Sequence, residues 1–117
     1  MALQWEQVIV HCLDPVALGT WWAEALGWVV VYSSADEFEI RPTTDQTPGL
    51  DFVRVDEQKS GKSRLHLDFR PDDRDAEVAR LVAHGAERVD IGQGDVSWVV
   101  LADPEGNEFC VLGQPGA

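Results

Sequence analysis

Alternating apolar and polar positions predict that the chain begins with a β-strand. Over residues 5–13, Val8 and Val10 lie on one face and Gln7 and His11 lie on the other. This period of two is typical of a strand whose aliphatic face packs on a core. If the aliphatic face packs on a helix, the side chains of the mixed face point toward the space that the sheet encloses.

A helix and three more strands are predicted to follow. Asp14 suits the N-cap, where its carboxylate bonds a free backbone N–H, and Pro15 loses no hydrogen bond in the first turn. Apolar residues then recur at helical spacing as far as Leu26, and Gly27 suits the left-handed residue that ends many helices. Strands are expected at residues 28–32, 38–41 and 50–55.

The second half of the chain repeats this order. Residues 64–70 alternate as a strand, with Leu65, Leu67 and Phe69 on one face. A helix capped by Asp72 or Asp73 and ending at residues 84–85 is followed by a strand at 87–91, and two further strands lie within residues 98–112. Asp73 follows Asp14 by 59 residues and His66 follows Gln7 by 59. The sequence therefore predicts an α+β fold of two tandem βαβββ modules.

The last two strands are joined by the polar turn 103–107. Asp103 can bond backbone amides ahead of it, Pro104 presets φ, and Gly106 accepts a positive φ. Alternation places Trp98 and Val100 on one face of the first strand. It also places Cys110 on one face of the second.

Length and charge limit the class of protein. At 117 residues the chain is predicted to be a single domain over residues 1–117, with modules at about 4–56 and 64–113 and a connector at 57–63. The formal net charge of −12 argues against nucleic acid and anionic membranes as partners, and it is compatible with a cationic ligand or simply a solvated surface. Without a signal-peptide pattern, a cytoplasmic location is the expectation. Cys12 and Cys110 lack metal-type spacing and are predicted to be buried thiols, with a disulfide as the alternative.

Three motifs together resemble the glyoxalase/bleomycin-resistance/extradiol-dioxygenase superfamily, also called vicinal oxygen chelate proteins. They are residues 14–28 (Asp-Pro followed by a helix ending in Trp-Trp-Ala-Glu-Ala-Leu-Gly-Trp), residues 64–69 (Arg-Leu-His-Leu-Asp-Phe) and residues 103–112. The sequence of these motifs is most similar to the small glyoxalase-like branch of this superfamily. The resemblance implies a curved mixed sheet around a concave pocket, with the helices outside. It also implies a set of cavity-facing residues: Gln7, Ile9, His11, Asp51, His66, Asp68, Trp98, Val100 and Cys110.

The resemblance also suggests where a metal would bind. Metal-using members carry four ligands: a His, Gln or similar side chain early in the first strand, a carboxylate on the fourth strand, a His at the start of the fifth strand and a Glu on the eighth strand. Gln7, Asp51 and His66 match the first three positions, but the fourth is Cys110, where metal-binding relatives carry Glu. The thiolate and imidazole of a Gln-Asp-His-Cys set suit Zn²⁺ or Fe²⁺. An octahedral, oxygen-rich site of the glyoxalase kind would lack its second carboxylate, which is also the candidate base. We expect no resident metal, with a divalent ion (Zn²⁺, Ni²⁺, Fe²⁺ or Mn²⁺) as the alternative.

Several of these residues have a purely structural interpretation. Asp68 or Arg64 could satisfy His66, and Cys110 could simply fill space in the core. Trp21, Trp22 and Trp28 are expected to pack the helix on the sheet or to form a dimer face, whereas the parity of Trp98 makes it the best platform for a bound ring. A local basic strip consists of Arg54, Lys59, Lys62 and Arg64. It could anchor a carboxylate, or it could pair with Asp56, Glu57 and Asp68, and the pairing is favoured.

Three functions follow from this pattern. The favoured one is a small-molecule-binding protein without a catalytic metal, which sequesters or senses an aromatic or cationic organic ligand and forms a homodimer. Its binding pocket is predicted to consist of Gln7, His11, His66, Asp68, Trp98 and Cys110, and no catalytic residue is assigned. The alternative is a metal-dependent lyase, isomerase or dioxygenase, in which the ion polarises vicinal oxygens of the substrate. The third is an accessory or dimerisation module with a vestigial pocket.

Overall fold

The computed structural model describes residues 2–113 and divides the chain into two compact units, Met1–Gln58 and Lys59–Ala117. The boundary falls inside the stretch predicted as a connector, and the single-domain organisation stays a prediction. Each unit is built as strand, helix and three strands. The prediction of an α+β fold with two βαβββ modules is confirmed.

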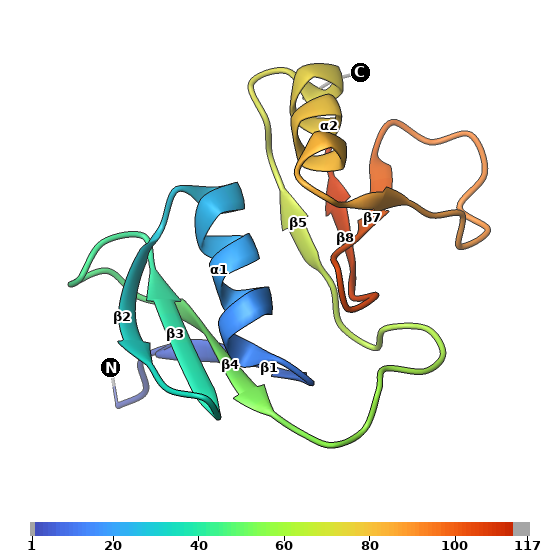
Figure 1. The fold of residues 1–117 in the computed structure, drawn as a ribbon. Coiled ribbons are helices and arrows are strands. Elements are labelled where there is room, and N and C mark those ends of the chain that lie inside the picture. The colour runs from blue at the N-terminus through green and yellow to red at the C-terminus, as the bar shows by residue number, and fades with distance from the viewer. Residues whose placement is uncertain (1, 114–117) are drawn as a thin grey trace. The chain divides into compact units, whose positions relative to one another are not determined.

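The first unit is a four-stranded mixed sheet with one helix on one face (Figure 1). The strand order is β1-β4-β3-β2, with β1 parallel to β4 and the other neighbours antiparallel. Its elements are β1 (Gln7–Cys12), α1 (Pro15–Leu26), β2 (Val29–Ser33), β3 (Glu37–Arg41) and β4 (Gly49–Arg54).

The second unit repeats this order as β5-β8-β7-β6, again with one parallel pair, β5 and β8. Asp68 lies opposite Cys110, just as Ile9 lies opposite Asp51 in the first unit. The elements are β5 (Leu67–Phe69), α2 (Arg74–Ala83), β6 (Glu87–Arg88), β7 (Val99–Ala102) and β8 (Glu108–Val111).

Helix α1 begins and ends as its sequence predicts. The Asp14 carboxylate accepts a hydrogen bond from the Ala17 amide at 3.1 Å, and Gly27 adopts the left-handed conformation with φ 68°. Gly19 lets the helix approach the sheet closely, because a Cβ there would lie 2.1 Å from the ring of Phe38. Leu18 and Phe52, both essentially unexposed, lie in the core of this unit.

Two predicted strands are shorter than expected. The strand predicted over residues 64–70 is limited to β5, and Leu65, expected on the core face, is 87% exposed. Its partner β8 begins only at Glu108, so the residues before His66 have no strand to pair with. The strand predicted over residues 87–91 is limited to β6, because the Gly92 amide bonds the Asp90 side chain and leaves the sheet.

The cysteines and tryptophans are placed largely as predicted. Cys12 and Cys110 are buried free thiols. Trp21 and Trp22 are buried and meet edge to face, with ring centroids 5.0 Å apart. Neither helix within residues 2–113 is long and apolar enough to span a bilayer.

Candidate functional site

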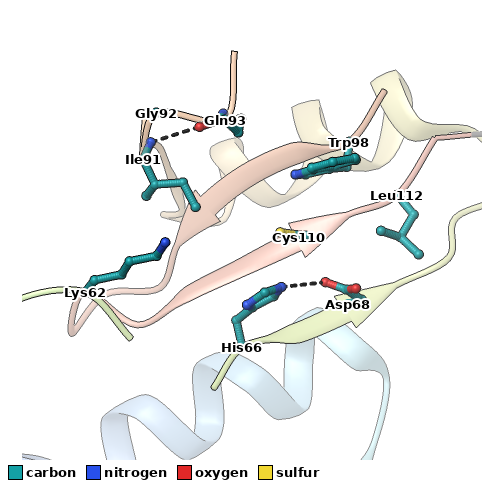
Figure 2. A pocket seen from close by; sticks show the side chains of 9 residues that line it. All are labelled: Lys62, His66, Asp68, Ile91, Gly92, Gln93, Trp98, Cys110 and Leu112. Carbon is teal, nitrogen blue, oxygen red and sulfur yellow. Dashed lines mark hydrogen bonds and ion pairs between the residues drawn. The ribbon is translucent and has the colours of Figure 1, made fainter. Parts of the chain in front are cut away.

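The second unit contains a pocket of about 470 Å³ on the open face of its sheet (Figure 2). Strands β5 and β8 form its floor, and the irregular segment before β7 borders it. The lining residues are Lys62, His66, Asp68, Ile91, Gly92, Gln93, Trp98, Cys110 and Leu112. This volume is in the range of sites that hold small organic molecules.

A histidine, a carboxylate and a thiol meet on the floor of the pocket. The His66 Nε2 lies 3.1 Å from the Asp68 Oδ1, and both side chains are about half exposed. Cys110 lies opposite Asp68 in the parallel ladder. One potential ligand atom from each of these three residues lies within 4.8 Å of the others. The pairing of His66 with Asp68 agrees with one of the structural roles predicted for this histidine.

The Cys110 thiol is held in its protonated form. Burial raises its pKa to about 11, and the charge and hydrogen bonding of Asp68 add to the effect. A nucleophilic cysteine requires the thiolate, which such surroundings disfavour. A thiol with a raised pKa is a poor nucleophile at neutral pH.

Trp98 supplies the aromatic wall of this pocket. It is 40% exposed, whereas its neighbour Val100, also predicted to face the cavity, is only 1% exposed and is not among the lining residues. Figure 2 shows the indole ring above the β8 strand, on the same side of the sheet as Cys110 and Leu112. A half-exposed indole on the wall of a pocket can stack on a planar ligand.

Within the second unit, Glu108 fastens the segment before β5 to the start of β8. This carboxylate lies 2.8 Å from the Lys59 ammonium and accepts a hydrogen bond from the Ser63 amide at 3.1 Å. Hydrogen bonding to Lys59 is the main cause that lowers the pKa of Glu108. Lys62 lies between these two anchored positions, and its side chain lines the pocket.

The first unit carries the other predicted site residues on the open face of its own sheet. Gln7 donates to the Asp51 Oδ2 at 3.3 Å, and Asp51 is only 2% exposed. Its Oδ1 accepts no hydrogen bond from the described residues. Burial raises the pKa of Asp51 to about 7, helped by hydrogen bonding with Glu37 and by the charges of Glu37 and Glu39. A protonated Asp51 can therefore donate to Glu37.

The predicted site residues thus fall into two groups. His66, Asp68, Trp98 and Cys110 surround one pocket in the second unit. Gln7, Ile9, His11 and Asp51 lie on strands of the first unit, where Ile9 and His11 are exposed. Whether either group binds a ligand stays a prediction.

Sequence reasoning missed part of the pocket. Leu112 has the same strand parity as Cys110, and this signal could have identified it. The segment containing Ile91, Gly92 and Gln93 has no periodicity, so no pattern could have placed it there. Lys62 was recognised only as a member of the basic strip.

The donors around Cys110 fit a borderline metal ion in their chemistry. An imidazole, a carboxylate and a thiolate are ligands that Zn²⁺ accepts, and the cluster is compact enough to converge on one ion. In that case His66, Asp68 and Cys110 would hold it, and the ion would supply Lewis-acid chemistry. This cluster differs from the set predicted from the sequence, which consists of Gln7, Asp51, His66 and Cys110. Within the second unit, the carboxylate beside His66 is that of Asp68.

Comparison with solved structures identifies the fold. The chain is similar to a glyoxalase/bleomycin resistance protein/dioxygenase family enzyme from Burkholderia phytofirmans PsJN, with a TM-score of 0.76, 19% identity, and coverage of 95% of this chain and 98% of that one. A fosfomycin resistance protein, FosX, from Mesorhizobium loti gives a TM-score of 0.70 at 14% identity, with 97% and 93% covered.

A third similar structure is the bleomycin-binding protein from Streptomyces verticillus complexed with copper(II)-bleomycin. Its TM-score is 0.65 at 15% identity, with 97% of this chain and 98% of that chain covered. None of the curated proteins matches this chain significantly. The glyoxalase-like domain family, in contrast, matches residues 7–112, which is most of the sequence. The chain therefore belongs to the glyoxalase-like domain family, as the three motifs of its sequence predicted.

Proposed function

We propose that this protein binds a small organic ligand whose aromatic ring stacks on Trp98, and that it acts by sequestration or sensing without a catalytic metal. The observation that carries this proposal is the half-exposed indole on the wall of a pocket of about 470 Å³. The described lining residues include no activated nucleophile, since the only thiol, Cys110, has a raised pKa.

The relatives support a binding role in general terms. One solved neighbour is a bleomycin-binding protein, and it was solved with copper(II)-bleomycin bound. Another is a fosfomycin resistance protein. At 14–15% identity these likenesses establish the fold, and a small-molecule ligand for this chain is a proposal that they support.

Replacement of Trp98 tests this proposal. Trp98→Ala should abolish the binding of aromatic compounds measured by calorimetry, because the stacking surface is lost, whereas Trp98→Phe should keep most of the affinity. Trp5→Ala is the matched control, since Trp5 is 66% exposed and does not line the pocket. Unchanged binding by the Trp98→Ala protein would contradict the proposal.

A metal-dependent lyase, isomerase or dioxygenase is the second candidate. The compact cluster of His66, Asp68 and Cys110 favours it, because three ligand atoms already lie within 4.8 Å of one another. Elemental analysis of protein purified without a metal-chelating tag separates the two candidates. Near-stoichiometric metal that is lost in the Cys110→Ala protein would support this second function.

A homodimer in the cytoplasm is also part of the proposal. Strand β2 is an edge of its sheet and exposes apolar side chains, with Val30 48% and Tyr32 51% exposed. Edge strands of this kind pair readily with another chain. Sedimentation equilibrium would measure the mass, and a purely monomeric protein at micromolar concentration would contradict this part of the proposal.

A further inference from the structure

We infer that the ligand of the second unit is an aromatic monocarboxylate, whose carboxylate binds the Lys62 ammonium while its ring stacks on Trp98. The inference rests on the proposed function, because it assumes that the pocket binds a ligand. It adds the charge of that ligand and the residue that recognises it. Three observations carry it: the charge of Lys62, the unused hydrogen-bond donors and the anchoring of the loop.

Lys62 is the cation of the basic strip that faces the pocket without a partner. Arg54 lies 3.7 Å from Asp36 and 3.8 Å from Asp56, and Lys59 lies 2.8 Å from Glu108. Among the described residues, Lys62 forms no ion pair or hydrogen bond, although its side chain lines the pocket. The pairing predicted for the strip is therefore confirmed for Arg54 with Asp56. Lys62 has no such partner among the described residues, so it is available to anchor a carboxylate, the other role predicted for the strip.

Two side-chain acceptors that line the pocket are already engaged. Asp68 is paired with His66, and it also interacts with the Cys110 thiol. The Gln93 Oε1 accepts a hydrogen bond from the Ile91 amide at 2.9 Å.

Several donors are left over. The Lys62 ammonium, the Gln93 side-chain amide and the Trp98 indole N–H donate to none of the residues 2–113. Three spare donors around one pocket favour a ligand that supplies acceptors, such as a carboxylate.

The positions of the charged groups favour an elongated ligand. Figure 2 shows Lys62 at one end of the pocket and Asp68 at the other, with His66 between them. A carboxylate beside Lys62 would lie at the opposite end of the pocket from Asp68, with its ring directed toward Trp98. Glu108 holds Lys59 and Ser63 on either side of Lys62, so the loop is ordered before the ligand arrives.

The net charge of −12 limits how negative the ligand can be. A single ammonium offsets one negative charge, and a dianion such as a phosphate would face the repulsion of the whole acidic protein. We therefore assign a monocarboxylate rather than a phosphate monoester.

Three probes that differ in charge test this inference. Naphthylacetate, naphthylacetamide and naphthylethylammonium share a ring and a short arm, and calorimetry gives each dissociation constant. Naphthylacetate should bind most tightly to the wild-type protein. Lys62→Gln should weaken its binding about tenfold, since one charge-assisted hydrogen bond is lost, and should change the binding of naphthylacetamide by less than about twofold.

Arg64→Gln is the matched control. It removes the same charge two residues further along the chain, at an exposed position that does not line the pocket, and should leave all three affinities within about twofold. An equal loss in the Arg64→Gln protein would overturn the inference, because only the general field would then matter.

The failure of this inference can be told apart from the failure of the proposed function. If naphthylethylammonium bound best, or if Lys62→Gln changed nothing while Trp98→Ala abolished binding, the pocket would bind aromatic ligands but not through Lys62. If none of the three probes bound to the wild-type protein, both the inference and the proposed function would be contradicted.

Discussion

The two units share one scaffold but carry different chemistry at equivalent positions. The strand orders β1-β4-β3-β2 and β5-β8-β7-β6 correspond, and the registers make Asp51 equivalent to Cys110 and Ile9 equivalent to Asp68. Glu39 lies opposite Asp51 in the first unit, and Val100 lies opposite Cys110 in the second, so Glu39 and Val100 are equivalent. Two residues before them, Glu37 and Trp98 are therefore equivalent as well. The first unit therefore places a carboxylate where the second has an aromatic wall.

This difference shows how a duplicated fold acquires a distinct site. In both units an acidic group on the parallel pair is buried, and burial raises its pKa, to about 7 for Asp51 and to about 11 for Cys110. In the first unit its neighbours are further carboxylates. In the second they are a carboxylate, an imidazole and an indole, together with the ammonium of Lys62, and there a pocket is present. The backbone supplies equivalent positions, and the side chains decide what can bind.

Placing a carboxylate at position 110 should have the largest effect on stability. Cys110→Asp reproduces the residue of the first unit but sets a buried carboxyl beside Asp68. We expect the free energy of unfolding at pH 8 to fall by about 3 kcal/mol, because one of two adjacent carboxylates must be desolvated while charged. Urea denaturation measures this change.

Two further variants isolate the cause. Cys110→Ala should cost about 1 kcal/mol, because it removes only a small buried group. Adding Asp68→Asn to the Cys110→Asp protein should restore part of the loss. A destabilisation by Cys110→Asp no larger than that of Cys110→Ala would show that Asp68 does not act on this position.

Neutralising Asp51 should have a smaller effect, and one that depends on pH. Its folded-state pKa of about 7 lies above the ordinary value of 3.8, so the folded protein binds more protons than the unfolded chain between these values. The stabilising contribution of the protonated carboxyl is full below pH 4 and is lost as the pH rises through 7. Asp51→Asn should therefore raise the free energy of unfolding at pH 8 by about 1–2 kcal/mol and flatten its pH dependence.

This measurement is made on chelator-treated protein, so that no metal affects Asp51. Glu39→Gln is the matched control, since Glu39 acts on Asp51 only through its charge and should flatten the pH dependence less. If the wild-type and Asp51→Asn proteins kept parallel stability curves from pH 4 to 8, Asp51 would not be the buried acid of the first unit.

Removing the Glu108 charge should have the smallest effect, with the opposite pH dependence. Its pKa is lowered, so its contribution is present above the ordinary range of a carboxyl and is lost as the pH falls through its folded-state pKa. Glu108→Gln should cost about 0.5–1 kcal/mol at pH 7 and nothing in strong acid. It should also weaken naphthylacetate binding, because the loop that carries Lys62 loses its ion pair with Lys59.

Thermal unfolding at pH 7 and in strong acid would measure the stability change, and calorimetry would measure the binding. Glu105→Gln serves as the control, because it changes a nearby carboxylate in the turn just before β8. A Glu108→Gln protein that lost stability equally at both pH values would contradict the role of this carboxylate as an ionised anchor.

Much of the fold could be predicted because its causes are local. Asp14 and Gly27 delimit α1 through capping geometry, and Asp103 organises the last turn by accepting from the Glu105 and Asn107 amides at 2.9 and 3.0 Å. Strand parity placed Trp98 and Cys110 on the pocket side of their strands. Each of these features depends on residues close together in the sequence.

The remainder depends on contacts that no local pattern encodes. The position of Lys62 is set by Glu108, which is far along the chain. The segment around Gln93 is held by its own side-chain bonds rather than by a strand ladder. The net charge is compatible with a cationic ligand, whereas the unpaired donors in the pocket favour an anionic one. The charge of the ligand stays a prediction.

A crystal structure of the protein with naphthylacetate would test the central claim most directly. We expect the ring to lie against Trp98, the carboxylate to lie within hydrogen-bond distance of the Lys62 ammonium, and Asp68 to stay paired with His66. A ring bound away from Trp98, or a metal ion held by His66 and Cys110 with no naphthyl group in the pocket, would contradict it.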